Sequence, residues 1–198
     1  MNILDLYANI DKTQRFVDEV FDAQIYSPVK PKLTIIDGGA YEGEFSYYCL
    51  PFAKVIYAFE PDPTPFDYMD KMIKKFELEK VIKHSNKALA GENGTRYLHA
   101  SGYGGSTMLA RGGEVNEEIP VEGITLATVI KENKLDQVDI LKLDMENSEE
   151  EVLKAPDFLE VADRVKMIIG EHLQNSNKLL KKLGYKSYNY AENTVYTK

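Results

Sequence analysis

Short apolar runs alternate with helix-type patterns along most of the chain, and this alternation constrains the fold more than any other feature. Residues 33–36 are rich in β-branched side chains and stop at a glycine turn, which is typical of a buried strand. A second run at residues 55–59 stops at a proline turn, and apolar residues recur at helical spacing in residues 45–50 and 66–76. Strands and helices that alternate in this way predict a parallel sheet covered by helices.

The rest of the chain continues the pattern with one interruption. Residues 91–121 are rich in glycine, and we expect a hairpin and an irregular loop there. The other expected strands are residues 81–88, 138–143 and 165–169, with an antiparallel pair at 185–188 and 193–196. The other expected helices are residues 126–134, 149–153 and 177–183. The predicted fold is therefore α/β, with a mainly parallel, doubly wound sheet and a C-terminal antiparallel strand pair.

The chain divides into a short N-terminal segment and one domain. Apolar residues recur at helical spacing in residues 2–23, and prolines mark a linker near residue 30. We predict an N-terminal helical cap at residues 1–30 and a single ligand-binding domain at residues 31–198, which is long enough to bury a core of its own.

Composition argues against several kinds of partner. The 198 residues carry a formal net charge of −8 at pH 7, whereas proteins that bind phosphate backbones need clustered Lys and Arg. We therefore expect no nucleic acid partner and favour a neutral or cationic substrate. The one cysteine, Cys49, lies in an apolar stretch and is expected to be structural. The sequence has no signal-peptide pattern and no run of about 20 apolar residues, so we expect a cytoplasmic protein without membrane contact.

The turn after the first strand, residues 36–43 (IDGGAYEG), is a candidate ligand site. Ligands of doubly wound sheets bind at the carboxyl ends of the strands, where small residues let the backbone approach closely. A dinucleotide site needs the motif G-x-G-x-x-G, but Ala40 stands at its third position and an acid would face the phosphates. Asp37, Gly39 and Gly43 instead suit a ligand with an amino-acid end and no phosphate, as in S-adenosylmethionine. An ordinary glycine turn without a ligand is the alternative.

An acid also follows the second strand. Glu60 lies 23 residues beyond Asp37, a spacing at which a carboxylate typically accepts the two ribose hydroxyls of an adenosine cofactor. Pro61 stops the strand and stiffens the turn. Together with the glycine turn, Glu60 predicts an adenosine site, whereas Glu60 alone would also fit a solvated acid at a strand end.

Charged residues also follow the strand at residues 138–143. Lys142, Asp144 and Glu146 share one face of an extended chain, and a lysine in a buried strand needs a partner, for which Asp144 is the nearest candidate. Three interpretations remain open: a structural pair with Glu146 capping the next helix, a carboxylate that takes a proton from a hydroxyl, or a magnesium site. His172 follows the next strand at the same edge, and the ordinary pKa of histidine suits a base near neutral pH.

Four blocks of the chain, in order, resemble the FkbM family of methyltransferases. They are residues 36–43 (IDGGAYEG), 58–63 (AFEPDP), 86–89 (NKAL) and 141–153 (LKLDMENSEEEVL). The likeness runs from about residue 33 to residue 172, and residues 105–109 (GSTML) stand where such proteins often carry a Ser-rich loop. Two positions depart from the family pattern, because Asn147 stands where the family usually has Gly and Met145 replaces a β-branched residue.

The resemblance implies a Rossmann-like methyltransferase fold with S-adenosylmethionine as the methyl donor. It places the methionine end at the glycine turn, the ribose at Glu60, the adenine near Asn86 and Ala88, and the reaction centre at Asp144. The cofactor-binding residues that we predict are Asp37, Gly38, Gly39, Ala40, Tyr41, Gly43, Phe45, Glu60, Pro61, Asn86 and Ala88.

The resemblance also implies a reaction, often O-methylation. We predict methylation of a small-molecule or glycan hydroxyl, with Asp144, Glu146 and His172 in catalysis and Ser106 and Thr107 at the substrate. No resident metal is expected. One alternative is a degenerate cofactor-binding or scaffold protein, because the short chain leaves little room for a dedicated substrate domain. A nicotinamide oxidoreductase is a further alternative, which the glycine turn disfavours.

Overall fold

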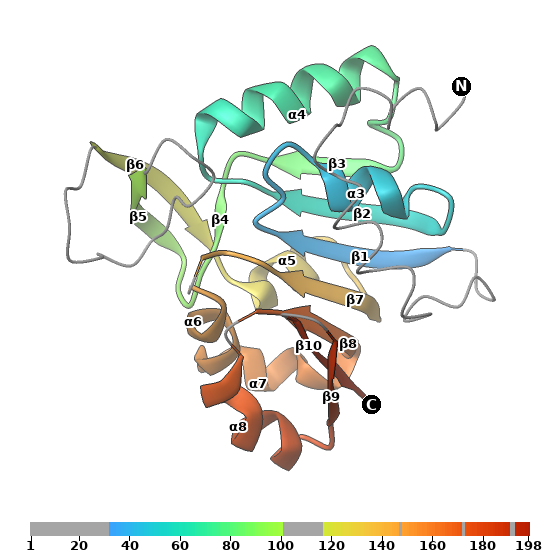
Figure 1. Cartoon of the computed structure of the whole chain (residues 1–198), viewed down its shortest axis with the longest axis vertical. Coiled ribbons are helices and arrows are strands. Elements are labelled where there is room, and N and C mark those ends of the chain that lie inside the picture. The colour runs from blue at the N-terminus through green and yellow to red at the C-terminus, as the bar shows by residue number, and fades with distance from the viewer. Residues whose placement is uncertain (1–31, 101–116, 147, 172, 191–192) are drawn as a thin grey trace.

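A seven-stranded sheet forms the centre of the molecule, with strand order β3-β2-β1-β7-β8-β10-β9 (Figure 1). The structure is a computed structural model, and it describes residues 32–100, 117–146, 148–171, 173–190 and 193–198. The expected N-terminal helical cap at residues 1–30 lies outside the described residues.

Most strands of this sheet are parallel. The parallel strands are β1 (Leu33–Gly38), β2 (Ala53–Phe59), β3 (Ile82–Ser85), β7 (Val138–Leu143) and β8 (Val165–Gly170), with β3 at one edge of the sheet. β10 (Asn193–Thr197) lies between β8 and β9 (Lys186–Tyr190) and runs antiparallel to both. The strand order reverses at β1, which pairs with β2 on one side and β7 on the other, and ligands of such sheets bind at this switch point. The fold class predicted from the sequence is confirmed, including its closing antiparallel strands.

Helices cover both faces of the sheet (Figure 1). The helices on one face are α3 (Glu44–Cys49) and α4 (Pro63–Lys75). Those on the other face are α5 (Leu126–Glu132), α6 (Glu149–Lys154), α7 (Phe158–Val161) and α8 (Asn177–Lys182). Short 3-10 turns occupy Ala162–Arg164 and Gln174–Ser176. In the part of the chain that the structure describes, no helix is both long and apolar enough to cross a bilayer.

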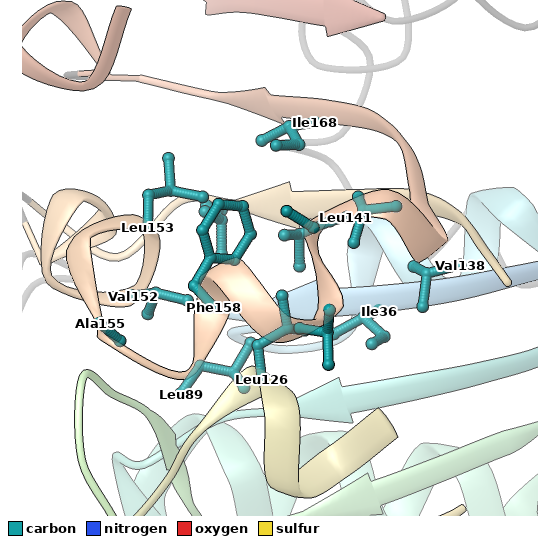
Figure 2. Close-up of a cluster of buried hydrophobic side chains, with 14 of the residues drawn as sticks. Ile36, Leu89, Leu126, Val138, Leu141, Val152, Leu153, Ala155, Phe158 and Ile168 are labelled. Carbon is teal, nitrogen blue, oxygen red and sulfur yellow. The ribbon is translucent and has the colours of Figure 1, made fainter. Parts of the chain in front are cut away.

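Neighbouring residues of β1 enter two different cores. Ile35 packs toward α3 and α4, whereas Ile36 packs toward α5, α6 and α7, and both side chains are fully buried. Figure 2 shows the second of these cores, where Ile36 and Leu141 of the sheet lie close to Leu126 and Phe158 of the helices. Because successive side chains of a strand point to opposite faces, a sheet covered on both sides needs continuous apolar runs, as the sequence shows.

A second, three-stranded sheet lies beside the carboxyl end of β1, where Leu89 packs against Gly38 (Figure 1). Its strands, in the order β4-β6-β5, are β4 (Ala88–Leu89), β6 (Glu117–Ile124) and β5 (Gly94–Ala100). β5 and β6 form the expected hairpin. The expectation of one strand over residues 81–88 is wrong, because β3 ends at Ser85, opposite the last residue of β2. Beyond that point β3 has no partner strand, and the chain turns to pair with β6 instead.

Candidate functional site

The carboxyl ends of β1, β2 and β7 meet at one edge of the main sheet. Gly38 lies opposite Phe59 on one side and opposite Leu143 on the other. The backbone amides of Gly39 and Ala40 both donate to the Phe59 carbonyl at 3.0 Å, which ties the turn after β1 to the turn after β2. The turns that the sequence indicated therefore converge on one small region, which is the candidate site.

Gly39 joins the turn after β1 to the turn after β7. Its φ is +72°, and a Cβ placed there would lie 1.8 Å from the carbonyl oxygen of Asp144. Only glycine fits, because other residues rarely adopt a left-handed φ and the backbone oxygen has no room to move. Gly43, with a φ of +96°, precedes α3, where a Cβ would meet the ring of Tyr47. The sequence pattern predicted that the backbone at these glycines approaches a ligand closely. The structure shows that packing within the protein already requires glycine at both positions.

Glu60 is held in place by the turn that it belongs to. The residue is 7% exposed, and its two carboxylate oxygens accept the backbone amides of Tyr41 and Asp62, each at 2.8 Å. Burial raises the pKa of Glu60 to about 7, although the two backbone donors act to lower it. Asn86 fixes the same turn, since its side-chain amide donates to the carbonyl oxygens of Glu60 at 2.8 Å and Pro61 at 3.0 Å. Each carboxylate oxygen keeps a further lone pair, so Glu60 can still accept ligand hydroxyls.

A buried ion pair lies next to the glycine turn. Asp37 and Lys142 stand opposite each other in the β1–β7 pairing, and Lys142 Nζ lies 3.2 Å from Asp37 Oδ1. Lys142 also donates to the Gly39 carbonyl at 2.7 Å and lies 3.7 Å from Asp144 Oδ2. The hydroxyl of Ser46 donates to Asp37 Oδ2 at 2.7 Å. Burial would lower the pKa of Lys142, but the carboxylates of Asp37 and Asp144 outweigh it and raise that pKa, so the amine is charged.

The structure corrects the expected partner of Lys142. The sequence favoured Asp144 because it is near in the chain, but Asp37 is the closer of the two carboxylates. The reason is the register of β1 and β7, which places residues far apart in the chain side by side. Asp37 is fully buried, so what the structure shows for it is an internal role, and its direct contact with a cofactor stays a prediction.

The turn after β7 carries the predicted acids Asp144 and Glu146. Both residues are half-buried, and Glu146 has a φ of +53°. Sequence reasoning missed Glu149, a fully buried acid at the start of α6 whose carboxylate accepts the backbone amide of Met145 at 2.7 Å. This bond closes the turn, and an acid in the first turn of an expected helix was the signal that could have indicated it.

Glu44, in the first turn of α3, is a second residue that the sequence reasoning missed. Burial raises its pKa to about 7, with further contributions from Glu42 and Asp37 that raise it and from Lys142 that lowers it. Two carboxyls that titrate near neutral pH, Glu44 and Glu60, therefore lie at this edge of the sheet, and shifted acids of this kind are frequent at functional sites.

The remaining predicted residues have mixed positions. The ring centre of Phe45 lies 5.9 Å from Lys142 Nζ, whereas Ala88 is buried in the small core of the second sheet with Leu98 and Val121. Among the described residues, no three His, Cys, Asp or Glu side chains are grouped so that they could hold a metal ion. Three predicted residues lie outside the described residues: Ser106, Thr107 and His172.

The sheet order, the antiparallel β10 inside the edge strand and the acidic turns at the carboxyl ends define the class as a Rossmann-like methyltransferase fold. The methyltransferase FkbM domain matches residues 37–190, and the chain belongs to this family. The resemblance seen in the sequence blocks is thereby confirmed. No curated protein sequence matches the chain.

Solved methyltransferase structures share the fold at low sequence identity. Methyltransferase FkbM from Methylobacillus flagellatus KT is 13% identical, with a TM-score of 0.58 over 84% of this chain and 44% of its own. Precorrin-6y C5,15-methyltransferase from Geobacter metallireducens is 14% identical, with a TM-score of 0.51 over 89% of this chain and 86% of its own. M. capricolum TrmK, in complex with S-adenosyl-homocysteine, is 13% identical, with a TM-score of 0.51 over 89% of this chain and 66% of its own. The chain thus spans less than half of the Methylobacillus protein.

Proposed function

We propose that the chain is an S-adenosylmethionine-dependent methyltransferase that methylates a hydroxyl of a small molecule or glycan. Family and fold support methyl transfer. The observation that carries the cofactor assignment is Glu60, a buried carboxylate at the end of β2 that two backbone amides hold beside the glycine turn. A cytoplasmic location and the lack of a nucleic acid partner belong to the same proposal, for which the net charge of −8 is the support.

The residues at this edge fit the proposed cofactor. Glu60 has free lone pairs for the ribose hydroxyls, and Asn86 holds the turn on which Glu60 stands. Asp37 supports the methionine end indirectly, because it pairs with the lysine that holds the glycine turn. The residues proposed to line the cofactor site are Asp37, Gly38, Gly39, Ala40, Tyr41, Gly43, Phe45, Glu60, Pro61, Asn86 and Ala88.

Bound S-adenosylmethionine supplies an electrophilic methyl group on a cationic sulfur. The part of this chain is to hold an acceptor hydroxyl in line with that group and to take its proton. Asp144 is the proposed base, because it is half-buried and follows β7 directly. His172 is the alternative base, Glu146 is a second acid on the same turn, and Ser106 and Thr107 are proposed to contact the acceptor.

A methyl-transfer screen tests this proposal. Purified protein with tritium-labelled S-adenosylmethionine should label pools of small alcohols or oligosaccharides. Asp144→Asn should reduce labelling by about 100-fold or more, the usual contribution of a general base, and change affinity for the neutral product S-adenosylhomocysteine only a few fold. Asp163→Asn, at an exposed acid paired with Lys198, is the matched control and should label normally. Labelling of added RNA alone would contradict the acceptor class, and cofactor binding without any transfer would favour the non-catalytic alternative.

A further inference from the structure

Two carboxylates lie within ion-pair distance of one buried lysine at the site. Lys142 Nζ lies 3.2 Å from Asp37 Oδ1 and 3.7 Å from Asp144 Oδ2. The side chains of Lys142 and Asp37 are 7% and 0% exposed, whereas that of Asp144 is 40% exposed. The ammonium therefore links a carboxylate inside the protein to one that a ligand can reach.

Lys142 reaches a third group besides its two nearest partners. Its ammonium has three donors, and Asp37 and the Gly39 carbonyl account for two of them. The third contact is the carboxylate of Asp144, which lies beyond hydrogen-bond distance but within ion-pair distance. Electrostatic attraction to the Lys142 ammonium therefore restrains the position of the Asp144 carboxylate, although the two groups form no direct hydrogen bond.

We infer that Lys142 is a positioning residue, which holds the Asp144 carboxylate against the glycine turn. The inference rests on the proposed function. Gly39 packs against the Asp144 carbonyl, and its own carbonyl accepts a hydrogen bond from Lys142. The one amine therefore holds both the turn proposed to receive the cofactor and the acid proposed to act as base.

Two cofactor analogues that differ in charge report on Asp144 without an acceptor. Sinefungin carries an amine, protonated at neutral pH, near the position of the methylated sulfur, whereas S-adenosylhomocysteine is neutral there. If the Asp144 carboxylate faces this position, the 198-residue chain prefers sinefungin, as measured by the ratio of the two dissociation constants. Asp144→Asn should lower that preference about tenfold, the usual effect of a hydrogen bond to a charged group.

Lys142→Met then separates three roles of the lysine. Positioning requires that the preference for sinefungin falls toward the Asp144→Asn value, because the carboxylate is no longer held. A purely electrostatic role requires that the preference rises, because a cation beside Asp144 has been removed. A role in the fold alone requires equal losses for both ligands and an unchanged preference. A rise or no change would each overturn the inference.

Two further variants keep the test decisive. Lys198→Met removes another lysine whose side chain is mostly covered and pairs with Asp163, and the preference of this variant should equal that of the wild type. Lys142→Met leaves Asp37 buried without its cation and can unfold the protein. The comparison is therefore repeated between the single variant Asp37→Asn and the double variant Asp37→Asn/Lys142→Met. The double variant should show a lower preference for sinefungin than the single variant. If the wild type binds neither analogue, the proposed function fails, whereas binding with an unchanged preference contradicts only the role of Lys142.

Discussion

At the scale of the residue, the site depends on carboxyl groups that the fold keeps from water. Glu60 is the clearest example, because burial raises its pKa to about 7 while two backbone amides hold its oxygens. Such a group is sensitive to its surroundings, since a ligand that donates hydrogen bonds stabilises its charged form. We therefore expect cofactor affinity to depend strongly on this one side chain.

Glu60→Gln should weaken binding of S-adenosylhomocysteine by about tenfold or more. The substitution removes the charged acceptor, and a hydrogen bond to a charged group contributes about 1.5–3 kcal/mol. It also turns an amide NH₂ toward Tyr41 or Asp62, whose backbone N–H groups need acceptors. Calorimetric titration measures the change, with Glu160→Gln, an exposed acid paired with Lys131, as the control. Equal dissociation constants for Glu60→Gln and wild type would mean that Glu60 has no ligand role.

The sequence indicated several of these acids but not their partners. Asp37, Glu60 and Asp144 were recognisable because each directly follows or ends an apolar strand pattern. The Asp37–Lys142 pair was not, because it arises from the register of β1 and β7, which no local pattern specifies. Glu149 was overlooked because its role is visible only once the turn at Met145 is known.

At the scale of the element, the glycine turn works by contact with the turn after β7. Gly39→Ala should therefore destabilise the protein and abolish cofactor binding, because its Cβ would lie 1.8 Å from the backbone oxygen of Asp144. Gly184→Ala is the matched control, since Gly184 also has a positive φ, +89°, but no atom within 4 Å of the added Cβ. Gly184→Ala should lose only about 1–2 kcal/mol of unfolding free energy, which is the cost of a left-handed backbone for alanine. This variant should bind the cofactor normally.

Urea unfolding and ligand titration of the two glycine variants check this expectation. The contact between the turns is important only if Gly39→Ala loses clearly more free energy of unfolding than Gly184→Ala. Similar losses in both variants, with binding retained, would mean that the β1 and β7 turns do not depend on each other.

The strands and most helices were predictable, and the exceptions have physical reasons. The strands of the main sheet are buried on both faces, so their sequences are continuous apolar runs with sharp ends. The break after Ser85 was missed because it depends on where the neighbouring strand β2 ends. β4 has two residues and α7 four, which is too short for a period to show.

At the scale of the whole molecule, acids with raised pKa values make stability depend on pH. Glu60 and Glu44 have pKa values of about 7 in the folded protein, against an ordinary value of 4.5. The unfolded chain loses these protons at lower pH than the folded chain does. The free energy of unfolding should therefore fall as pH rises from about 4.5 to about 7 and level off above that.

Urea unfolding across this pH range measures the effect. Glu44→Gln should flatten part of the decline, because the variant has no proton to lose at that position, and Glu160→Gln should not. Three other acids have lowered pKa values: Asp70, Glu150 and Asp163. They change the free energy of unfolding only below about pH 4.5, so they do not affect this measurement. A free energy of unfolding that rises steadily from about pH 4.5 to 7 would contradict the raised pKa values of Glu44 and Glu60.

The central claim is that the carboxyl edge of the sheet holds S-adenosylmethionine, and parallel titration with S-adenosylhomocysteine and NAD tests it most directly. Calorimetry of the 198-residue chain should show one S-adenosylhomocysteine bound per chain, and the melting temperature should rise because the ligand binds only the folded state. NAD should give neither heat nor a melting shift, because the glycine turn lacks the phosphate-binding pattern. Binding of NAD, with no response to S-adenosylhomocysteine at about millimolar concentration, would contradict the claim.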